Sequence, residues 1–465
     1  MTEGQLDPGG QLAIETEDPN TGQAFSNRVL MLFATQVFTA GMAIFNGFLL
    51  ARALGPSAKG DYYLVTLFPA TIMVFIQFGL PSALSYFSAR GLVDRITTRT
   101  LILTGALVVP ALLLVVAILP LLQQTIVQGP DTALILFCLL ALPLLLNATF
   151  TTAVVIGRQA VGWASGVYVV VAASTTALLV LFVVILDLGL TGALLAYLLN
   201  ALILFVGFIL GAKRTSDRPP RNGSVSYRSL FGFGLRLYPG NLSQFLTNRA
   251  DVYLIAWLMA DPSAPLGYYS MGVSMAELVL FFPRVVSTIF FPHVSRASRE
   301  DADRQVPRVT RVTLLLTAGV AVTMVPVATF LILVLIPAFT PALSALYVLL
   351  PGVAALSVSE VLSGYAAGLG RTTTTSMVSI SVLIANVALN ILLIPMFGIV
   401  GAALASLFAY AFAAVTFSVI ASRLADTPLR QFWIPRADDV RFVVSTLMAL
   451  ARRILGTRTG ATRAG

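Results

Sequence analysis

The sequence predicts an all-α polytopic membrane protein with twelve transmembrane helices in two six-helix lobes. Three observations predict this fold: the composition, the number of long apolar segments, and the distribution of basic residues. Of the 465 residues, 57% are hydrophobic and 11% are charged, whereas about a quarter of the residues of a soluble domain are charged. A chain of this composition is expected to lie in a lipid bilayer.

Twelve apolar segments approach the ~20 residues that a helix needs to cross the hydrocarbon layer. We predict spans at residues 29–51, 64–88, 100–122, 132–155, 166–187, 190–211, 231–259, 266–294, 312–336, 342–368, 374–396 and 399–422.

The basic residues are distributed unevenly between the loops. If the N-terminus is cytoplasmic, 24 of the 29 lysines and arginines lie in inner loops or tails. Cytoplasmic loops of membrane proteins carry such an excess. The asymmetry therefore predicts a multi-pass protein of the cytoplasmic (inner) membrane with both termini inside. It also accounts for the formal net charge of +9, so we expect no nucleic-acid partner.

The composition along the chain divides it into five parts. These are a disordered, acidic cytoplasmic tail (1–27), an N-terminal six-helix lobe (28–212), a Pro-rich cytoplasmic linker (213–227), a C-terminal six-helix lobe (228–423) and a basic cytoplasmic tail (424–465). Within that last tail, residues 436–455 are amphipathic and basic, with too short an apolar run to span. We expect them to form an amphipathic helix on the inner membrane surface.

Three local matches between the halves indicate an internal repeat. GPSAKGDYYLV (55–65) resembles DPSAPLGYYSM (261–271), IGRQ resembles LGRT after the fourth span of each half, and GLTGALLA resembles GIVGAALA. The matches occur in the same order, and the two members of each match are separated by nearly the same number of residues, which chance rarely produces. Six spans in each half give both halves the same orientation, so the sequence predicts a parallel repeat around a central cavity.

The residues needed for several enzyme classes are missing from the sequence. The chain has one cysteine, Cys138, and one histidine, His293, which excludes a disulfide framework and a His/Cys metal cage. Neither Lys59 nor Lys213 follows a glycine, so there is no P-loop. We find no catalytic nucleophile–base pair and predict binding and translocation without a cofactor or metal.

Polar residues on one face of each of two spans are the candidate site. A charged side chain at membrane depth normally faces a cavity or a partner. The predicted cavity lining is Ser270, Ser274, Glu277, Arg284 and Thr288 in the eighth span and Asn241, Gln244, Asn248 and Asp251 in the seventh. The alternative for Glu277 and Arg284 is a buried interaction that only stabilises helix packing.

The embedded charges suggest what the cavity binds. Arginine pairs bidentately with phosphate or carboxylate, so Arg249, Arg284 and Arg236 favour an anionic substrate. Arg249 could instead pair with an acidic side chain, since it lies outside the polar arc of its helix. Glu277, Asp251 or Glu360 could hold a coupling proton or sodium ion, with the membrane potential as a further driving force.

Three features of the repeat are expected at the membrane boundary. Lys59 is expected to be a snorkelling anchor at an outer helix end. The tyrosine pairs at 62–63 and 268–269 are expected at the lipid–water interface, where aromatic side chains are enriched.

Five segments together carry a resemblance to a known family. They are ARALGPSAKGDYYLV (51–65), GLPSALSYFSARG (79–91), NRADVYLIAWL (248–258), GYYSMGVSMAELVLFFPRVVSTIFFPHVSR (267–296) and LLPGVAALSVSEVLSGYAAGLGR (349–371). Across residues 28–425 the chain resembles the polysaccharide flippases of the multidrug/oligosaccharidyl-lipid/polysaccharide exporter superfamily.

The resemblance implies alternating access and export of a polyprenyl-diphosphate-linked oligosaccharide for cell-surface or exopolysaccharide assembly. It implies that Arg249 and Arg284, with Arg236, bind the diphosphate while the lipid tail stays in the bilayer. Glycosyltransferases and a polysaccharide polymerase are the expected protein partners. Two alternatives stay open: a cation-coupled drug or metabolite antiporter of the same fold, and a transport-inactive scaffold of a glycan-assembly complex.

Overall fold

The computed structural model describes residues 19–93, 96–125, 130–215, 225–281 and 298–445, together with 283–284, 286–287, 294 and 448. These residues contain α-helices and short helical turns, and no strand occurs among them. The helices of the first half are α1 (Pro19–Ile76), α2 (Leu80–Ala89), α3 (Ile96–Thr125), α4 (Thr132–Leu139), α5 (Ala141–Gly157), α6 (Val161–Leu179) with the π-helical turn η1 (Val180–Ile185), and α7 (Gly189–Thr215). Those of the second half are α8 (Tyr227–Leu258), α9 (Ser263–Val279), α11 (Arg299–Leu335), the turn η2 (Pro337–Phe339), α12 (Ala342–Gly368), α13 (Thr372–Phe397), α14 (Ile399–Leu424) and α15 (Arg430–Trp433).

The described helices confirm the all-α polytopic fold. Nine of them are long and apolar enough to cross a membrane within the described residues. One, Ala34–Ile76, has 43 residues and is bent at Gly55, so it comprises two spans. Together with α8, which is 32 residues long but polar, and the 17-residue α9, the arrangement is compatible with twelve spans.

The bend in α1 separates the first two predicted spans. Gly55 has φ 72° and ψ 178°, a backbone conformation that glycine adopts without the steric clash of a Cβ atom. The helix direction therefore changes at Gly55, and Pro56 begins the second arm. The first arm starts at Pro19, so residues 19–27 continue this helix rather than the predicted tail. Residues 1–18 and 216–224, from the predicted tail and linker, lie outside the described residues.

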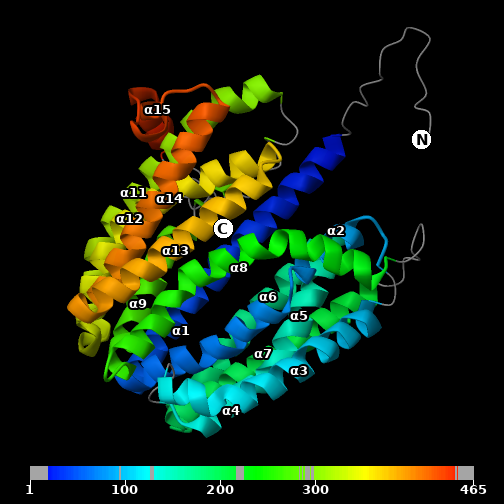
Figure 1. Cartoon of the computed structure of the whole chain (residues 1–465), viewed down its shortest axis with the longest axis vertical. Helices are drawn as coiled ribbons and strands as arrows, with labels where there is room; N and C mark the ends of the chain where they lie inside the picture. The colour runs from blue at the N-terminus through cyan, green and yellow to red at the C-terminus, as the bar shows by residue number, and fades with distance from the viewer. Residues whose placement is uncertain are drawn as a thin grey trace, which may run out of the picture.

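The two halves of the chain lie on opposite sides of α1. Figure 1 shows α3 to α7 in cyan and green on one side and α11 to α14 in yellow and orange on the other. The halves meet where α1 packs along α9 and where α2 packs against α8. One hydrophobic cluster runs across this boundary and includes Leu64 and Phe68 of α1, Ile255 of α8 and Met275 of α9.

The α1–α9 contact is built from the two copies of the first repeated segment. A Cβ atom on Gly60 would lie 1.8 Å from the Ser263 carbonyl oxygen, and one on Gly267 would lie 2.0 Å from the Pro56 carbonyl oxygen. Each glycine thus lets the backbone of the other helix approach closely, as small residues do between transmembrane helices. We call these four residues, Pro56, Gly60, Ser263 and Gly267, the repeat contact.

Candidate functional site

The larger cavity between the halves lies between the first arm of α1 and α9. Its volume is about 390 Å³. The polar side chains in its wall are Gln36 from α1, Ser274 and Glu277 from α9, and Arg284; the rest of the lining is apolar or glycine. An apolar cavity of this size with a few convergent polar groups is typical of a small-molecule site.

A second, smaller cavity lies behind the first, among α8, α9, α12 and α14. Its volume is about 20 Å³, which is room for about one water molecule or small ion. Asn248, Asp251, Glu277 and Arg284 line it, together with Tyr269, Tyr410 and apolar side chains. Glu277 and Arg284 belong to the walls of both cavities, so an occupant of either one lies near these two charges.

Arg249 is held behind the cavity wall by two contacts. Its Nη2 atom lies 3.2 Å from Glu277 Oε1, and its Nη1 atom donates a hydrogen bond of 2.9 Å to the Tyr63 hydroxyl. The side chains of Arg249 and Glu277 are 26% and 35% exposed. The pair is therefore partly screened, and a phosphate group that reaches the cavity could compete with the carboxylate for this guanidinium.

Asp251 is a buried carboxylate with its acceptor oxygens engaged. The residue is 4% exposed. Its Oδ2 atom accepts a hydrogen bond from the Tyr269 hydroxyl, and its Oδ1 atom accepts one of 2.9 Å from the Val252 backbone amide. Because Tyr269 comes from α9, this bond joins α8 to α9 beside the small cavity.

Lys59 contradicts the prediction of a snorkelling anchor. It is 6% exposed, and its Nζ atom donates a hydrogen bond of 2.7 Å to Ser270 Oγ. The ammonium also lies 5.6 Å from the centre of the Phe339 ring. Nearby, Ser263 Oγ donates a bond of 2.7 Å to Asp61 Oδ1. Polar contacts therefore flank the repeat contact, because the two repeated helices face each other rather than lipid.

Tyr63 and Tyr269 also contradict the prediction of a position at the lipid–water interface. Tyr269 is fully buried against Asp251, and Tyr63 accepts the hydrogen bond from Arg249. Local sequence alone does not separate a tyrosine at the lipid boundary from one that bonds a buried charge. The recurrence of a tyrosine pair in both repeated segments was the available signal that one tyrosine of each pair bonds a charged residue of α8.

The structure brings together part of the predicted site. Asn248, Asp251, Ser274, Glu277 and Arg284 line one or both cavities. Ser270 lies at the Lys59 contact instead. Asn241, Gln244 and Arg236 are exposed on α8 and are not among the residues that line these two cavities. Thr288 lies outside the described residues.

Glu360 on α12 is connected to the site through Arg284. The two side chains interact electrostatically, and the backbone carbonyl of Glu360 accepts a hydrogen bond of 2.9 Å from Ser287 Oγ. Charges from α8, α9, α12 and the segment after α9 are thus coupled around the two cavities. Which of them contact a substrate or a coupling ion stays a prediction.

Comparison with known proteins places these features in a recognised fold. Residues 49–340 match the family described as "Polysaccharide biosynthesis protein". No curated protein matches the sequence. An inward-facing multidrug resistance MATE family transporter of the MOP superfamily superposes with a TM-score of 0.64 at 16% identity, covering 84% of this chain and 96% of that one.

Two further solved structures share the arrangement. The lipid II flippase MurJ, in an inward closed conformation, has a TM-score of 0.65 at 15% identity, covering 87% of this chain and 89% of that one. A mutant of the Vibrio cholerae MATE transporter VcmN has a TM-score of 0.54 at 17% identity, with coverage of 87% and 98%. At these identities the likeness concerns the fold alone.

Proposed function

The chain belongs to the polysaccharide biosynthesis protein family, and on that premise we propose that it is a flippase for a polyprenyl-diphosphate-linked oligosaccharide. The family match covers residues 49–340, which confirms the resemblance to the exporter superfamily. In this proposal the protein lies in the cytoplasmic membrane with both termini inside and works by alternating access. The observation that carries it is the wall shared by the two cavities, where Glu277 and Arg284 lie beside a largely apolar chamber.

The geometry supports a substrate whose diphosphate lies in the protein and whose polyprenyl chain lies in the bilayer. The diphosphate would contact Arg284 in the wall of the larger cavity. Arg249 would join it when the diphosphate displaces Glu277, since guanidinium binds phosphate bidentately. Arg236, farther along α8, would contact the anion at another stage of its path. The polyprenyl chain would leave the cavity for the bilayer, where its methylene groups avoid water.

Ion coupling follows from the competition between Glu277 and the diphosphate for Arg249. A proton or sodium ion bound at Glu277, Asp251 or Glu360 would neutralise a carboxylate and release the arginine beside it. The substrate and the ion would then affect each other's binding reciprocally, as thermodynamic linkage requires. The membrane potential would add to this driving force, since charge moves across the membrane with the substrate. Glycosyltransferases and a polysaccharide polymerase would supply and consume the substrate.

Native mass spectrometry of the purified protein in mild detergent tests this proposal. We expect a bound mass that fits a polyprenyl-diphosphate glycan, and we expect Arg284→Gln or Arg249→Gln to remove it. Arg423→Gln, at the exposed end of α14, is the matched control and should keep the lipid. Retention of the glycan lipid in both cavity variants would exclude Arg249 and Arg284 as the diphosphate site.

A cation-coupled antiporter is the second candidate, because acidic Glu277 and Asp251 line the cavities and MATE transporters share the fold. The same experiment separates the two functions. If the wild type carries no polyprenyl lipid but binds added organic cations, and Glu277→Gln abolishes that binding, the antiporter is favoured. If neither ligand binds and glycan export is normal with Glu277→Gln, the scaffold role is favoured.

A further inference from the structure

The C-terminal segment folds back onto the second half of the molecule. Phe432 of α15 is fully buried in a hydrophobic cluster that includes Val306 and Phe417. The Trp433 indole Nε1–H donates a hydrogen bond of 3.0 Å to Ser418 Oγ on α14. Residues 437–445 then form a further helical segment, which we call the C-terminal helix. The beginning of the C-terminal segment, at α15, is therefore held by tertiary contacts and is not a free tail.

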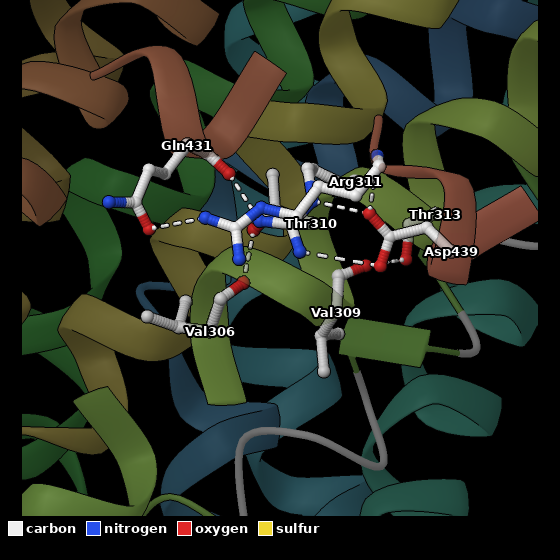
Figure 2. A network of polar contacts seen from close by, with 8 residues as sticks. Val306, Val309, Thr310, Arg311, Thr313, Gln431 and Asp439 are labelled. Atoms are coloured by element: carbon white, nitrogen blue, oxygen red, sulfur yellow. Dashed lines mark hydrogen bonds and ion pairs between the residues drawn. The ribbon is translucent and has the colours of Figure 1, made fainter. Parts of the chain in front are cut away.

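Arg311 of α11 anchors this segment. Its Nε atom lies 2.5 Å from Asp439 Oδ2, its Nη2 atom lies 3.3 Å from Asp439 Oδ1, and its Nη1 atom donates a bond of 2.6 Å to the Gln431 carbonyl oxygen. Figure 2 shows the guanidinium between these two partners. The side chains of Arg311 and Asp439 are 5% and 2% exposed. A bidentate pair removed from water in this way orients both groups specifically.

Arg311 lies immediately before the apolar part of α11. Residues 312–335 contain no charged side chain, and 24 helical residues at 1.5 Å each extend about 36 Å, slightly more than the ~30 Å hydrocarbon layer. In α14 the only charged residue is Arg423, in the last turn. Arg311 therefore holds the C-terminal helix near a membrane boundary, and Ser418 holds the preceding α15 there.

The C-terminal helix has three different faces. Asp439, which pairs with Arg311 of α11, and Val443 are buried. Val440 and Val444, four residues apart, are 43% and 42% exposed and follow one side, as i, i+4 spacing requires. Arg441 and Ser445 occupy the exposed side beyond this apolar strip.

Basic side chains gather around the apolar strip. Arg436 and Arg441 flank it, and Arg308 of α11 lies over the Phe442 ring at 5.1 Å. Arg304 and Arg430, from the neighbouring turns, are exposed as well. Arg441 has Asp438 3.8 Å away, but both side chains are more than 80% exposed, so this pair leaves the arginine available to other anions.

We propose that the C-terminal helix is a docked membrane-surface element that binds the headgroups of anionic phospholipids. The apolar strip lies in the headgroup–acyl boundary, and the surrounding arginines contact the lipid phosphates. An amphipathic helix with a basic polar side has this affinity, which depends on apolar area and on lipid charge. Arg311 sets the depth and direction of the helix, so the surface is preformed. This inference does not depend on the transported substrate.

The test uses the full-length protein in nanodiscs. In a Cys138→Ala background, an environment-sensitive fluorophore is attached at Val444→Cys, and quenching by spin-labelled lipid is measured as phosphatidylglycerol replaces phosphatidylcholine. We expect a blue-shifted, strongly quenched signal that increases with the anionic fraction. The matched probe at Ser445→Cys, on the polar side, should stay in water and be quenched weakly at every composition.

The arginines are tested in the same system. Arg436→Gln and Arg441→Gln should each lower the apparent affinity for the anionic lipid about five-fold, because a basic residue near an anionic surface contributes about a factor of this size. Equal quenching with and without phosphatidylglycerol, or weak quenching at both positions, would overturn the proposal. So would a blue shift in lipid-free detergent that grows with protein concentration, since it would assign the strip to a second copy of the chain.

Discussion

Lys59 Nζ lies 2.7 Å from Ser270 Oγ across the α1–α9 contact, and Lys59 is 6% exposed. Within the described part of the chain, the ammonium contacts a neutral hydroxyl and the Phe339 ring. An ammonium group removed from water without a carboxylate partner is costly. The contact between the two repeated helices therefore contains a group that gains hydration when the helices separate, which favours opening at this position.

Replacement of Lys59 should shift the equilibrium between closed and open forms of this contact. Lys59→Met removes the unpaired charge and keeps most of the side-chain volume. We expect the open population to fall about ten-fold, because removing a single ion from water costs several kcal/mol and the methionine has no such cost. Spin labels at Ser57→Cys and Asp261→Cys, both exposed near the contact, measure the two populations. Lys213→Met, at an exposed lysine, should change nothing, and a larger open population in Lys59→Met would contradict the interpretation.

The repeat contact should not tolerate a methyl group at Gly60. Gly60→Ala places a Cβ atom 1.8 Å from a backbone oxygen, which the helices can relieve only by moving apart. We expect a loss of stability of at least about 1–3 kcal/mol, the usual range for overpacking, measured by thermal unfolding in detergent. Gly41→Ala, on the same helix with nothing within 4 Å, is the control and should be neutral or stabilising. Equal melting temperatures for the two variants would show that the contact is looser than described.

Glu277 should compete with an anionic ligand for Arg249. Glu277→Gln removes the competing charge and should strengthen binding of a short-chain polyprenyl diphosphate by up to about five-fold, because a partly exposed ion pair contributes at most ~1 kcal/mol. Arg249→Gln should weaken the same binding. Isothermal titration calorimetry measures both effects. Weaker binding in Glu277→Gln would mean that the carboxylate orients the arginine rather than competing with the ligand.

Loss of the Tyr269 hydroxyl should destabilise the protein through Asp251. Tyr269→Phe leaves the buried carboxylate with the Val252 amide as its remaining recorded donor. We expect a decrease of about 1–3 kcal/mol in the free energy of unfolding, the range for a buried polar group that loses a partner. Tyr268→Phe, at the adjacent half-buried tyrosine, should lie within about 0.5 kcal/mol of wild type. A neutral Tyr269→Phe would indicate that water replaces the hydroxyl.

Docking of the C-terminal helix should be lost in acid. Burial would raise the pKa of Asp439, but hydrogen bonds from Arg311 and the Arg436 amide, together with the Arg311 charge, hold this pKa below its ordinary value of 3.8. A carboxyl whose folded-state pKa is depressed stabilises the fold above its unfolded-state pKa, and this contribution disappears as the pH falls through the folded-state value. Docking should therefore be constant from pH 8 to about pH 5 and weaken below about pH 4.

Hydrogen–deuterium exchange of residues 430–445 measures this docking, with a peptide from α13 as the internal reference. Asp439→Asn should exchange faster already at pH 7, because a buried charged partner is left uncompensated. Asp438→Asn changes the neighbouring exposed carboxylate and should behave as wild type. Fast exchange in the wild type at pH 7 would show that the Arg311 pair does not hold the segment.

Hydropathy and charge along the chain were sufficient to predict the fold. The apolar segment from 399 to 422 became α14, Ile399–Leu424, and the segment from 374 to 396 became α13, Thr372–Phe397. A bilayer requires each spanning helix to be apolar over ~20 residues and to satisfy its own backbone. These requirements act within one segment at a time, so the sequence alone was sufficient to predict an all-α polytopic fold.

Only the tertiary structure decided which polar side chains meet. Lys59 and Tyr269 were predicted at the membrane boundary, yet they lie between α1, α8 and α9. Helical periodicity shows that Glu277 and Arg284 share a face, but it does not show that Arg249 pairs with Glu277 from another helix. The environment of a polar group in a span depends on the helix that covers it. That helix is set by packing between residues about 200 positions apart, which close approach at Gly60 and Gly267 makes possible.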